Sequence, residues 1–254
     1  MLDGRLMHRL DYQDSIFKQS YDGGSQTRGE TRALKYRLSA SLDGQPVSAA
    51  DQLVNLMVER VEDDNTAAPD YDSANNSLAL EYRGFFDNGL DVQAGLRSDD
   101  FDSFADFTSW TLGLSWQVAG TPYRLHASAG RGLVKPSYYE LFADNSYTLG
   151  NPRLKPERNS GYDIGIEAEV LDGRGTVDLT YFNERMEDEI SYAFGAAPDA
   201  SGRASYVNHA GGYDIDDNLR GTARFVNLFD KDYMDVWGYA TQGRTAYVGL
   251  EATW

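Results

Sequence analysis

Carboxylates are the commonest residues in this chain that could do chemistry. The sequence holds 40 acidic residues against 23 basic ones, a formal net charge of −17. Three carboxylates, Asp99, Asp100 and Asp102, fall within the run DDFD. Oxygen-rich sets of this kind can hold Ca²⁺, although this one lacks the central glycine and final glutamate of an EF-hand. Two interpretations stay open, a calcium site or a solvated acidic loop, and the sequence favours the second.

Nucleophilic catalysis has little support in the sequence. Cysteine is absent, and the three histidines, His8, His126 and His209, have no serine or aspartate at a recognised spacing. The run from Asp230 to Tyr233 carries reactive residue types, yet a hairpin loop explains it better. We therefore predict that the protein is not an enzyme and, calcium apart, that it has no cofactor.

Two pairs of charged residues are expected to meet across tight turns. The turn LDGRG places Glu167 opposite Asp178, and two facing carboxylates raise one pKa, recruit a cation or share a nearby arginine or water. The turn FFDNG is expected to bring Arg83 near Asp91 as a cross-strand ion pair.

Turns of this kind require strands, and the sequence alternates with a period of two residues. In the run RALKYRLSASL, every second residue from Leu34 to Leu42 is apolar, and the residues between are polar or charged. This pattern is typical of a strand with one apolar face. We predict about twelve strands. They lie near residues 4–13, 34–42, 52–61, 78–83, 90–97, 110–116, 123–127, 162–168, 177–181, 204–211, 218–228 and 246–254.

The expected connections alternate between short and long. Short ones lie at 42–46, 85–89, 118–122, 171–175 and 211–217. Long ones lie near 13–29, 62–75, 98–107, 132–157, 187–203 and 229–243. Up-and-down strands put all short turns at one end of the sheet and all long loops at the other, as outer-membrane barrels do with their periplasmic turns and extracellular loops. The segment GNPRLKPE, residues 150–157, belongs to the longest loop.

Composition narrows the fold class. No run of 18 apolar residues occurs and the mean hydropathy is −0.54, which excludes a transmembrane helix but not a membrane barrel. The negative charge argues against nucleic acid as a partner. Aromatic residues recur near the strand ends, as interfacial girdles do. We predict one all-β domain over residues 1–254, a transmembrane antiparallel up-and-down barrel. The alternative is a soluble ligand-binding β-barrel or sandwich.

Two long segments resemble the TonB-dependent outer-membrane receptors. The first is GRGLVKPSYYELFADNSYTLGNPRLKPERNSGYDIGIEAEV, which carries the family's "GNPxLKPE" loop between two strands. The second, VNLFDKDYMDVWGYATQGRTAYVGLEATW, resembles the family's C-terminal hairpin. The resemblance covers at least residues 76–254 and is closest to the cobalamin and siderophore receptors.

The resemblance implies a function and a location. It implies uptake of a bulky nutrient, such as cobalamin or a ferric siderophore, across the outer membrane of a Gram-negative bacterium. Outer-loop aromatic residues would contact the ligand or belong to the outer girdle: Tyr138, Tyr139, Phe142 and Tyr147. The last strand would be the signal read by the barrel assembly machinery: Val248, Leu250, Ala252 and Trp254. Outer-membrane lipid and lipopolysaccharide would be further partners.

The sequence also departs from the family pattern. Members carry a plug domain and a TonB-contacting segment before a barrel of about 22 strands. Neither part is recognisable here, and about four barrel strands are missing before the final hairpin. We therefore expect a truncated or reduced form, in which coupling to TonB is in doubt. The alternative function is a plugless passive pore or a structural outer-membrane barrel.

Overall fold

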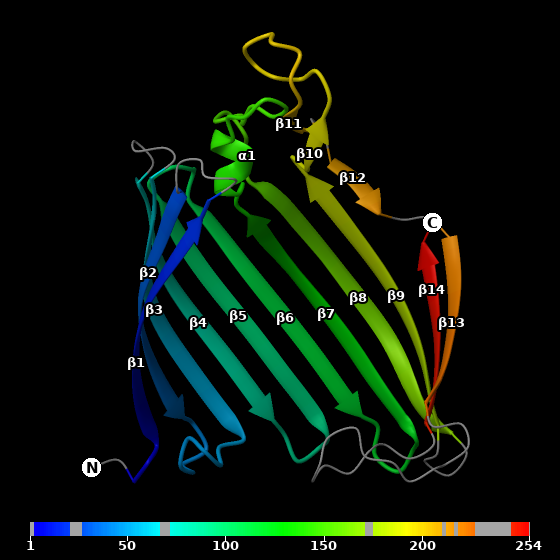
Figure 1. The fold of residues 1–254 in the computed structure, drawn as a ribbon. Helices are drawn as coiled ribbons and strands as arrows, with labels where there is room; N and C mark the ends of the chain where they lie inside the picture. Colours follow the sequence, from blue (N-terminus) through cyan, green and yellow to red (C-terminus); the bar gives the residue numbers. More distant parts are fainter. Residues whose placement is uncertain are drawn as a thin grey trace.

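Nine long strands follow one another through a curved sheet (Figure 1). The computed structural model describes residues 3–20, 27–66, 72–170, 175–209, 212–215, 218–226 and 245–253. The nine strands are β1 (Leu6–Gln19), β2 (Thr27–Ser41), β3 (Gln52–Asn65), β4 (Asp72–Phe85), β5 (Leu90–Phe101), β6 (Phe107–Gln117), β7 (Tyr123–Val134), β8 (Glu157–Val170) and β9 (Gly175–Glu187). Each pairs with the next in antiparallel register. The predicted all-β, up-and-down order is confirmed for this part of the chain.

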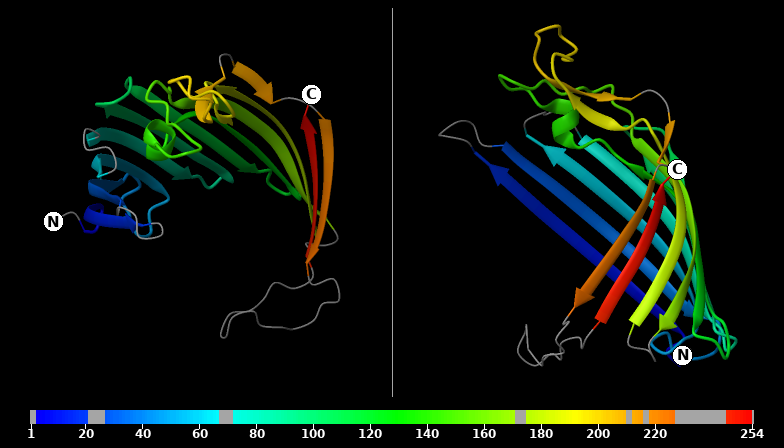
Figure 2. Two further views of the ribbon diagram at one scale, coloured as in Figure 1. Left: turned by 45° about the horizontal axis from the view of Figure 1, so that its top comes forward. Right: turned by 90° about the vertical axis from the view of Figure 1, so that its right-hand side faces the viewer.

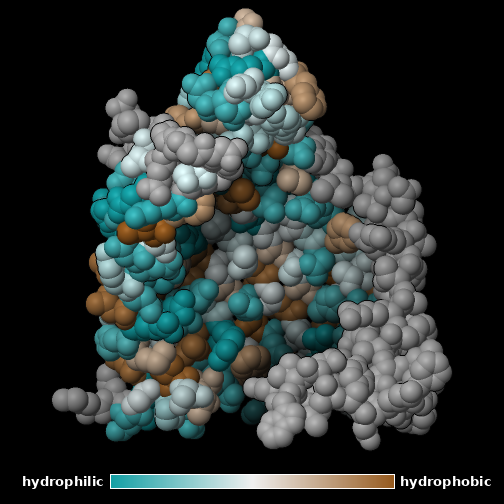
Figure 3. Space-filling view, viewed as in Figure 1, coloured by the Kyte–Doolittle hydropathy of each residue, from teal (hydrophilic) through white to brown (hydrophobic). Residues whose placement is uncertain are grey.

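The two faces of the sheet differ as the alternation predicts. Leu96 lies opposite Leu80 and Trp110 on the convex face, and all three side chains are exposed. One residue further on, Arg97 points to the concave face, where its Nη1 reaches Glu59 of β3 at 3.1 Å. Side chains two strands apart meet in this way only on the inner side of a curved sheet. Figure 2 shows the curvature, and Figure 3 looks onto the concave face, where hydrophilic residues prevail.

The sheet has no apolar core between its faces. In the described part of the chain, the buried apolar residues larger than alanine are Pro136, Leu141 and Leu154, and all three lie in the connection between β7 and β8, beyond the strand ends. A soluble barrel or sandwich needs its apolar faces packed together. In the described sheet, leucine, isoleucine and tryptophan side chains of the convex face are exposed instead of packed against a second sheet. The predicted soluble alternative therefore has no support. No helix among the described residues has the length and apolar character needed to cross a bilayer.

Beyond β9 the up-and-down order ends. The short β12 (Gly212–Ile215) pairs with one end of β9, opposite Glu184 to Glu187. The other end of β9, at Thr176 to Leu179, pairs in parallel with β14 (Thr245–Thr253). In turn β14 pairs with β13 (Asn218–Val226), which confirms the predicted antiparallel hairpin. Because β12 occupies only part of the edge, the remainder is free for β14.

The described sheet is therefore open rather than closed into a ring. In the residues that the structure describes, β1 pairs only with β2 and β13 only with β14. Figure 2 shows the resulting arc. The predicted barrel closure is not seen in the described strands.

Three of the predicted long loops are shorter than expected. Strand β1 continues to Gln19, β3 to Asn65 and β5 to Phe101. Strand pairing therefore extends into the predicted loops 13–29, 62–75 and 98–107. In these ranges the alternation of apolar and polar residues is lost, as in the run Glu62–Asn65 or at the neighbours Ile16 and Phe17, while the backbone pairing continues. The loop predicted at 132–157 is confirmed, since β7 ends at Val134 and β8 begins at Glu157.

The turn after β4 shows the tight connections at the other end. Gly89 adopts a φ of 79°, and its N–H donates to the carbonyl of Phe86. The resulting register sets Arg83 opposite Gln93, not Asp91. Arg83 instead lies 5.1 Å from the ring centroid of Phe85, and no ion pair to Asp91 occurs among the described contacts. The predicted ion pair is wrong because the turn shifts the pairing by two residues.

Candidate functional site

A compact cap stands beyond the strand ends, built from residues 135–156 and 188–209 (Figure 1). It contains α1 (Tyr138–Phe142) and a hairpin of β10 (Ile190–Ala193) and β11 (Ser205–Asn208). A capping box begins the helix, because Ser137 and Glu140 accept each other's backbone N–H groups. We call these two segments the cap.

The segment GNPRLKPE closes the first half of the cap onto itself. The N–H of Gly150 donates to the carbonyl of Ala143 at 2.6 Å, and the N–H of Asn151 donates to Glu140 at 2.8 Å. A Cβ on residue 150 would lie 2.5 Å from the carbonyl of Leu141, so only glycine fits this approach. Leu154 is buried in the cap. Backbone hydrogen bonds and the close approach at Gly150 therefore hold this loop against α1.

The same segment fastens the hairpin to the sheet. Asn151 donates from Nδ2 to the carbonyl of Tyr206 at 3.0 Å. Asn208 accepts the N–H of Lys155 at 2.8 Å, and Glu157 accepts the N–H of Ile190 at 2.6 Å. Two loops that are distant in sequence are thus held as one unit.

Arg203 makes a second connection between the two segments. Its guanidinium lies 2.7 Å from Asp144 and 2.8 Å from Asp199. The Ser201 hydroxyl and backbone N–H, together with Arg203, hold the pKa of the Asp199 carboxyl at about 2. The Asp199–Arg203 pair, within the second segment, is therefore ionised at neutral pH, and the Arg203–Asp144 pair joins the two segments.

Four rings form a continuous aromatic cluster on this cap. The ring centroids of Tyr139 and Tyr206 lie 6.3 Å apart, those of Tyr192 and Tyr206 5.2 Å, and those of Tyr192 and Phe194 5.5 Å, all nearly edge to face. Tyr139 is 50% exposed and Phe194 89% exposed. Burial, followed by the nearby Tyr139, raises the pKa of the Tyr206 phenol. We call Tyr139, Tyr192, Phe194 and Tyr206 the aromatic cluster.

The four aromatic residues predicted from the sequence separate into two groups. Tyr138 and Phe142 lie one turn apart within α1, with their ring centroids 5.5 Å apart, and both are half-buried. Tyr139 joins the aromatic cluster, and Tyr147 is 81% exposed on the loop. Sequence reasoning missed Tyr192, Phe194 and Tyr206. Tyr192 and Phe194 belong to the run SYAF in the predicted loop 187–203, whereas Tyr206 falls in the segment 204–211 that was predicted as a strand.

The concave wall of β7 to β9 carries the facing carboxylates that the sequence predicted. The register sets Glu167 opposite Asp178, which confirms that pairing. Arg124 binds Glu167 at 2.8 Å, and His126 Nε2 lies 2.9 Å from Asp178. Of the partners expected for the two facing carboxylates, the structure shows a nearby arginine, which pairs with Glu167. His126 contacts the second carboxylate, Asp178.

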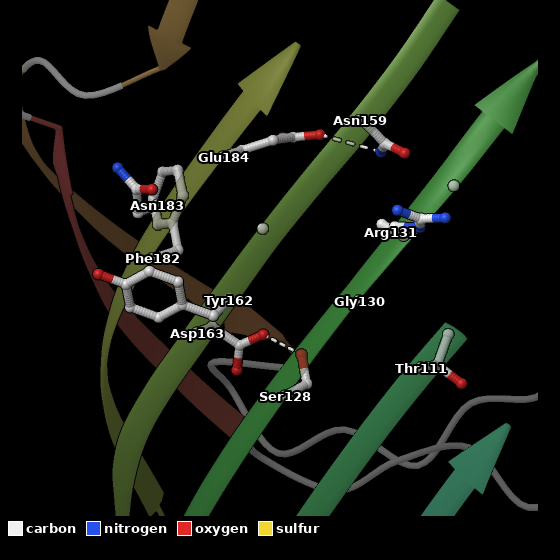
Figure 4. Close-up of a pocket in the computed structure, with 12 residues that line it drawn as sticks. Thr111, Ser128, Gly130, Arg131, Asn159, Tyr162, Asp163, Phe182, Asn183 and Glu184 are labelled. Atoms are coloured by element: carbon white, nitrogen blue, oxygen red, sulfur yellow. Dashed lines mark hydrogen bonds between the residues drawn. The ribbon is translucent and has the colours of Figure 1, made fainter. Parts of the chain in front are cut away.

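A hollow of about 400 Å³ lies next to these pairs, over β6 to β9 (Figure 4). Its floor includes Gly130 and Gly161, which leave the backbone uncovered. Ser128 donates to Asp163, and Asn159 donates to Glu184 at 3.3 Å. The lining thus combines polar and acidic side chains with Arg131 and with the rings of Tyr162 and Phe182.

The three aspartates of the predicted calcium site do not converge. Asp99 points to the concave face, where it binds Arg97 at 2.9 Å, because it lies in a strand and not in a loop. Asp100 and Asp102 alternate to the opposite face. Among the described residues, no group of three or more histidine or carboxylate side chains could hold a metal ion. The calcium prediction has no support in this part of the chain.

The residues of the predicted assembly signal lie on the last strand. Val248, Leu250 and Ala252 occupy alternate positions of β14, opposite Ala223, Gly221 and Leu219 of β13. Trp254 and the segment from Asp230 to Tyr233 lie outside the described residues. The strand itself is as predicted, and its reading by assembly machinery stays a prediction.

Comparison with known proteins supports the assignment of this fold. Residues 3–253 match the family described as "TonB dependent receptor-like, beta-barrel". The chain is 31% identical over 119 residues to the vitamin B12 transporter BtuB of Vibrio vulnificus, a match that covers 46% of this chain and 18% of that protein. It is 28% identical over 112 residues to BtuB of Photobacterium profundum, covering 43% of this chain and 17% of that one.

Solved structures show the same fold. The siderophore receptor PirA of Pseudomonas aeruginosa gives a TM-score of 0.64 at 19% identity, over 84% of this chain and 40% of that one. The ferric enterobactin receptor PfeA of Pseudomonas aeruginosa, in complex with BCV-L6, gives 0.60 at 18% identity, over 87% and 41%. The chain spans less than half the length of each of these relatives. Because the family match extends over nearly the whole chain, this protein belongs to the TonB-dependent receptor-like β-barrel family.

Proposed function

We propose that this chain is the barrel portion of an outer-membrane receptor that takes up a bulky nutrient such as cobalamin or a ferric siderophore. The observation that carries the proposal is the aromatic cluster, which a rigid cap presents above the concave wall. Exposed rings on a fixed loop offer a large contact area at low entropic cost to an apolar or planar ligand. The polar wall below would then line the path of entry.

The relatives point in the same direction. BtuB is a vitamin B12 transporter, and PirA and PfeA are siderophore and ferric enterobactin receptors. Since the chain spans only part of their length, we propose a truncated or reduced form of such a receptor. Energy coupling through TonB would then require parts beyond those recognised in this sequence.

Residence in the outer membrane of a Gram-negative bacterium is part of this proposal. The convex face presents an apolar belt that includes Leu80, Leu96, Leu112 and Leu114, all exposed. In a bilayer this belt would contact lipid acyl chains, and the charged strand ends above it would meet lipopolysaccharide. The strand with Val248, Leu250 and Ala252 would be the segment recognised by the barrel assembly machinery.

Arginine scanning of adjacent residues tests the membrane placement. Leu114→Arg puts a charge on the lipid-facing side near mid-strand, and we expect it to lower the free energy of unfolding in liposomes by about 2 to 4 kcal/mol. Ser115→Arg, on the concave face, is the matched control and should cost much less. Urea titration of the chain in liposomes measures both. A silent Leu114→Arg together with a disruptive Ser115→Arg would mean that the faces are reversed.

Ligand binding tests the role of the aromatic cluster. Cyanocobalamin and ferric enterobactin are titrated against the chain in lipid nanodiscs by calorimetry. Replacing Tyr139 and Tyr192 with serine should weaken whichever ligand binds by about tenfold or more, since aromatic anchors carry most of the energy at such sites. Tyr123→Ser, at the opposite end of the sheet, should leave binding unchanged. Failure of both ligands to bind the parent chain would contradict the proposal.

A passive pore is the second candidate, favoured by the glycine-floored hollow and the polar concave wall. A pore of this kind would conduct ions in a planar bilayer without added ligand. A steady conductance that Tyr139→Ser and Tyr192→Ser leave unchanged would support the pore, whereas ligand binding without conductance would support the receptor.

A further inference from the structure

The concave wall carries a group of cations over its first three strands. A hollow of about 340 Å³ lies there, over β1 to β3. Its lining includes the cations Arg9, Lys35 and Arg37 and the carboxylates Asp11 and Glu59. We call it the basic hollow.

The basic hollow lies away from the cap. Strand β1 starts at the end of the sheet opposite the cap, and Arg9 and Asp11 belong to the first half of this strand (Figure 1). Arg37 lies in the second half of β2, which runs back toward the same end. The aromatic cluster therefore has no part in this hollow.

The register sets like charges against each other at the basic hollow. In the antiparallel pair of β1 and β2, Arg9 lies directly opposite Arg37, and Asp11 lies opposite Lys35. Like charges at facing positions of a sheet repel each other and destabilise the pair. An anion placed between the two guanidinium groups would replace this repulsion with attraction.

Both carboxylates of the basic hollow are already engaged with cations. Asp11 accepts the Nε–H of Arg9 with both of its oxygens, at 2.9 Å each. Glu59 lies 2.6 Å from the Nζ of Lys35 and 3.1 Å from the Nη1 of Arg97. Neither carboxylate therefore neutralises the remaining cation of the hollow.

Arg37 is that remaining cation. It is half-buried, and within the described part of the chain its guanidinium has no hydrogen bond and no ion pair. On the β3 side it faces the apolar Met57. The described hydrogen bonds of Arg9 use only its Nε, so the terminal nitrogens of that side chain are unused as well. A guanidinium group has five N–H donors, and the basic hollow thus borders many unsatisfied ones.

The basic hollow also has room for an occupant. Ala33 lines it, on the face of β2 that carries Lys35 and Arg37, and its methyl group leaves space between these long side chains. A water molecule takes up about 30 Å³ of the liquid. A volume of about 340 Å³ therefore accommodates a small anion together with several waters.

We propose that the basic hollow binds a phosphate group, either as the free ion or as an ester. Arg9 and Arg37 would each donate to phosphate oxygens through the terminal nitrogens of the guanidinium fork, and Lys35 would add a third positive charge. A carboxylate has two oxygens and satisfies one fork, whereas a phosphate group has at least three and can accept from both.

This site goes beyond the proposed function, because it requires neither the cap nor a nutrient ligand. A chain with a net charge of −17 repels anions in general, so phosphate would bind only where cations are gathered locally.

Calorimetric titration of the chain in lipid nanodiscs tests the site with two probes, inorganic phosphate and glycerol 3-phosphate. Acetate is the comparator, since it offers only two oxygens. We expect phosphate to bind at least about tenfold more tightly than acetate. Tighter binding of glycerol 3-phosphate than of phosphate would identify an ester as the ligand, and the reverse order would identify the free ion. Equal affinity for both phosphates and acetate would overturn the proposal.

Variants locate the phosphate site. Arg37→Gln should weaken phosphate binding about tenfold, and Arg37→Lys should restore part of the affinity, since it keeps the charge without the fork. Arg83→Gln removes the same charge from β4, outside the lining of the basic hollow, and is the matched control. An equal loss in Arg83→Gln, or no loss in Arg37→Gln, would show nonspecific attraction and end the proposal.

Urea unfolding in liposomes gives a second readout that a merely structural role of Arg37 would not produce. Saturating phosphate should raise the urea midpoint of the parent chain, because a ligand that binds only the folded state stabilises it, and should leave that of Arg37→Gln unchanged. Without phosphate, Arg37→Gln should keep or raise the midpoint, since it removes one of two facing like charges. A midpoint that falls in Arg37→Gln without phosphate would show that Arg37 holds the sheet together and would contradict the proposal.

Discussion

The two halves of the concave wall accommodate their charged side chains in different ways. Over β2 to β5, long charged side chains cross the strands and neutralise one another: Lys35 reaches Glu59 at 2.6 Å, and Arg97 joins Glu59 to Asp99. Glu59 and Asp99 are both buried. We call this row of alternating charges the ladder.

Over β7 to β9 the wall has fewer cations and more glycine. Its concave positions include Gly130, Gly161 and Gly165. Its carboxylates exceed its cations: Asp163, Glu167, Asp178 and Glu184 stand against Arg124, and the His126 imidazole lies beside Asp178. We call this half the glycine wall. Here the space that long side chains fill in the ladder stays open as the hollow of Figure 4.

The same apolar pattern on the convex face is therefore compatible with two different concave surfaces. Both halves present leucine, isoleucine and aromatic residues on the convex face, which demands only that every second residue be apolar. The residues between are free to form a filled and neutral surface or an open and acidic one. The ladder fills the concave side with paired charges, and the glycine wall leaves space there.

Removing an arginine from each half should give the largest contrast. Arg97→Leu leaves Glu59 and Asp99 buried without their shared cation, and we expect a loss of about 2 to 3 kcal/mol in the free energy of unfolding. Arg124→Leu breaks a single, more exposed pair with Glu167 and should cost about 1 kcal/mol or less. Urea unfolding in liposomes measures both variants. Equal losses would mean that the ladder is not a cooperative unit.

Adding a methyl group should show how tightly each glycine position is packed. A Cβ on Gly165 would lie 2.4 Å from the His126 ring and 2.6 Å from Thr180 Oγ1. Gly165→Ala should therefore displace His126 from Asp178 and cost about 1 to 2 kcal/mol. At Gly113, the nearest atom is 3.9 Å away, so Gly113→Ala is the control and should be neutral or slightly stabilising. A neutral Gly165→Ala would show that the histidine has room to move.

Protonation of Asp43, in the turn after β2, should produce the smallest change in the free energy of unfolding. Asp43, in the turn after β2, accepts the N–H of Gln45, the Ser41 hydroxyl and the N–H groups of Gln52 and Asp51, which hold its pKa at about 2. The folded pKa lies below the unfolded one, so this stabilisation is present above about pH 4 and is lost as the pH falls toward 2.

Asp43→Asn should therefore flatten the loss of stability between pH 5 and pH 2, measured as the urea midpoint in liposomes. Ser41→Ala removes one donor and keeps the backbone donors, so it should shift the profile less. A profile that Asp43→Asn leaves unchanged would place the acid sensitivity elsewhere, in the ladder or the glycine wall.

Much of the sheet could be predicted because a membrane-type strand repeats its pattern every two residues. The runs from Leu34 to Leu42 and from Leu90 to Leu96 indicated the strands and their faces, and Glu167 and Asp178 were paired correctly across their turn. Prediction failed where the two-residue alternation gives no information. One such place is the strand end around Asp99, where neighbouring residues on both faces are polar. The other is Arg83, whose partner depends on the geometry of the turn.

The candidate site was less predictable, since its residues come from two separate loops. Tyr139 was found from the sequence, while Tyr192, Phe194 and Tyr206 were not. Aromatic residues in a loop carry no period, and only the contacts through Asn151 and Asn208 reveal that the two loops form one cap.

The amino-acid order alone dictates which side of each strand is apolar and which is charged, because alternation is a local property that the backbone enforces. Which charges meet, where the wall is filled or hollow, and how β12 and β14 share the edge of β9 emerged only in the folded sheet. These outcomes depend on register and curvature. Register and curvature are set by many strands together, so no single stretch of the chain encodes them.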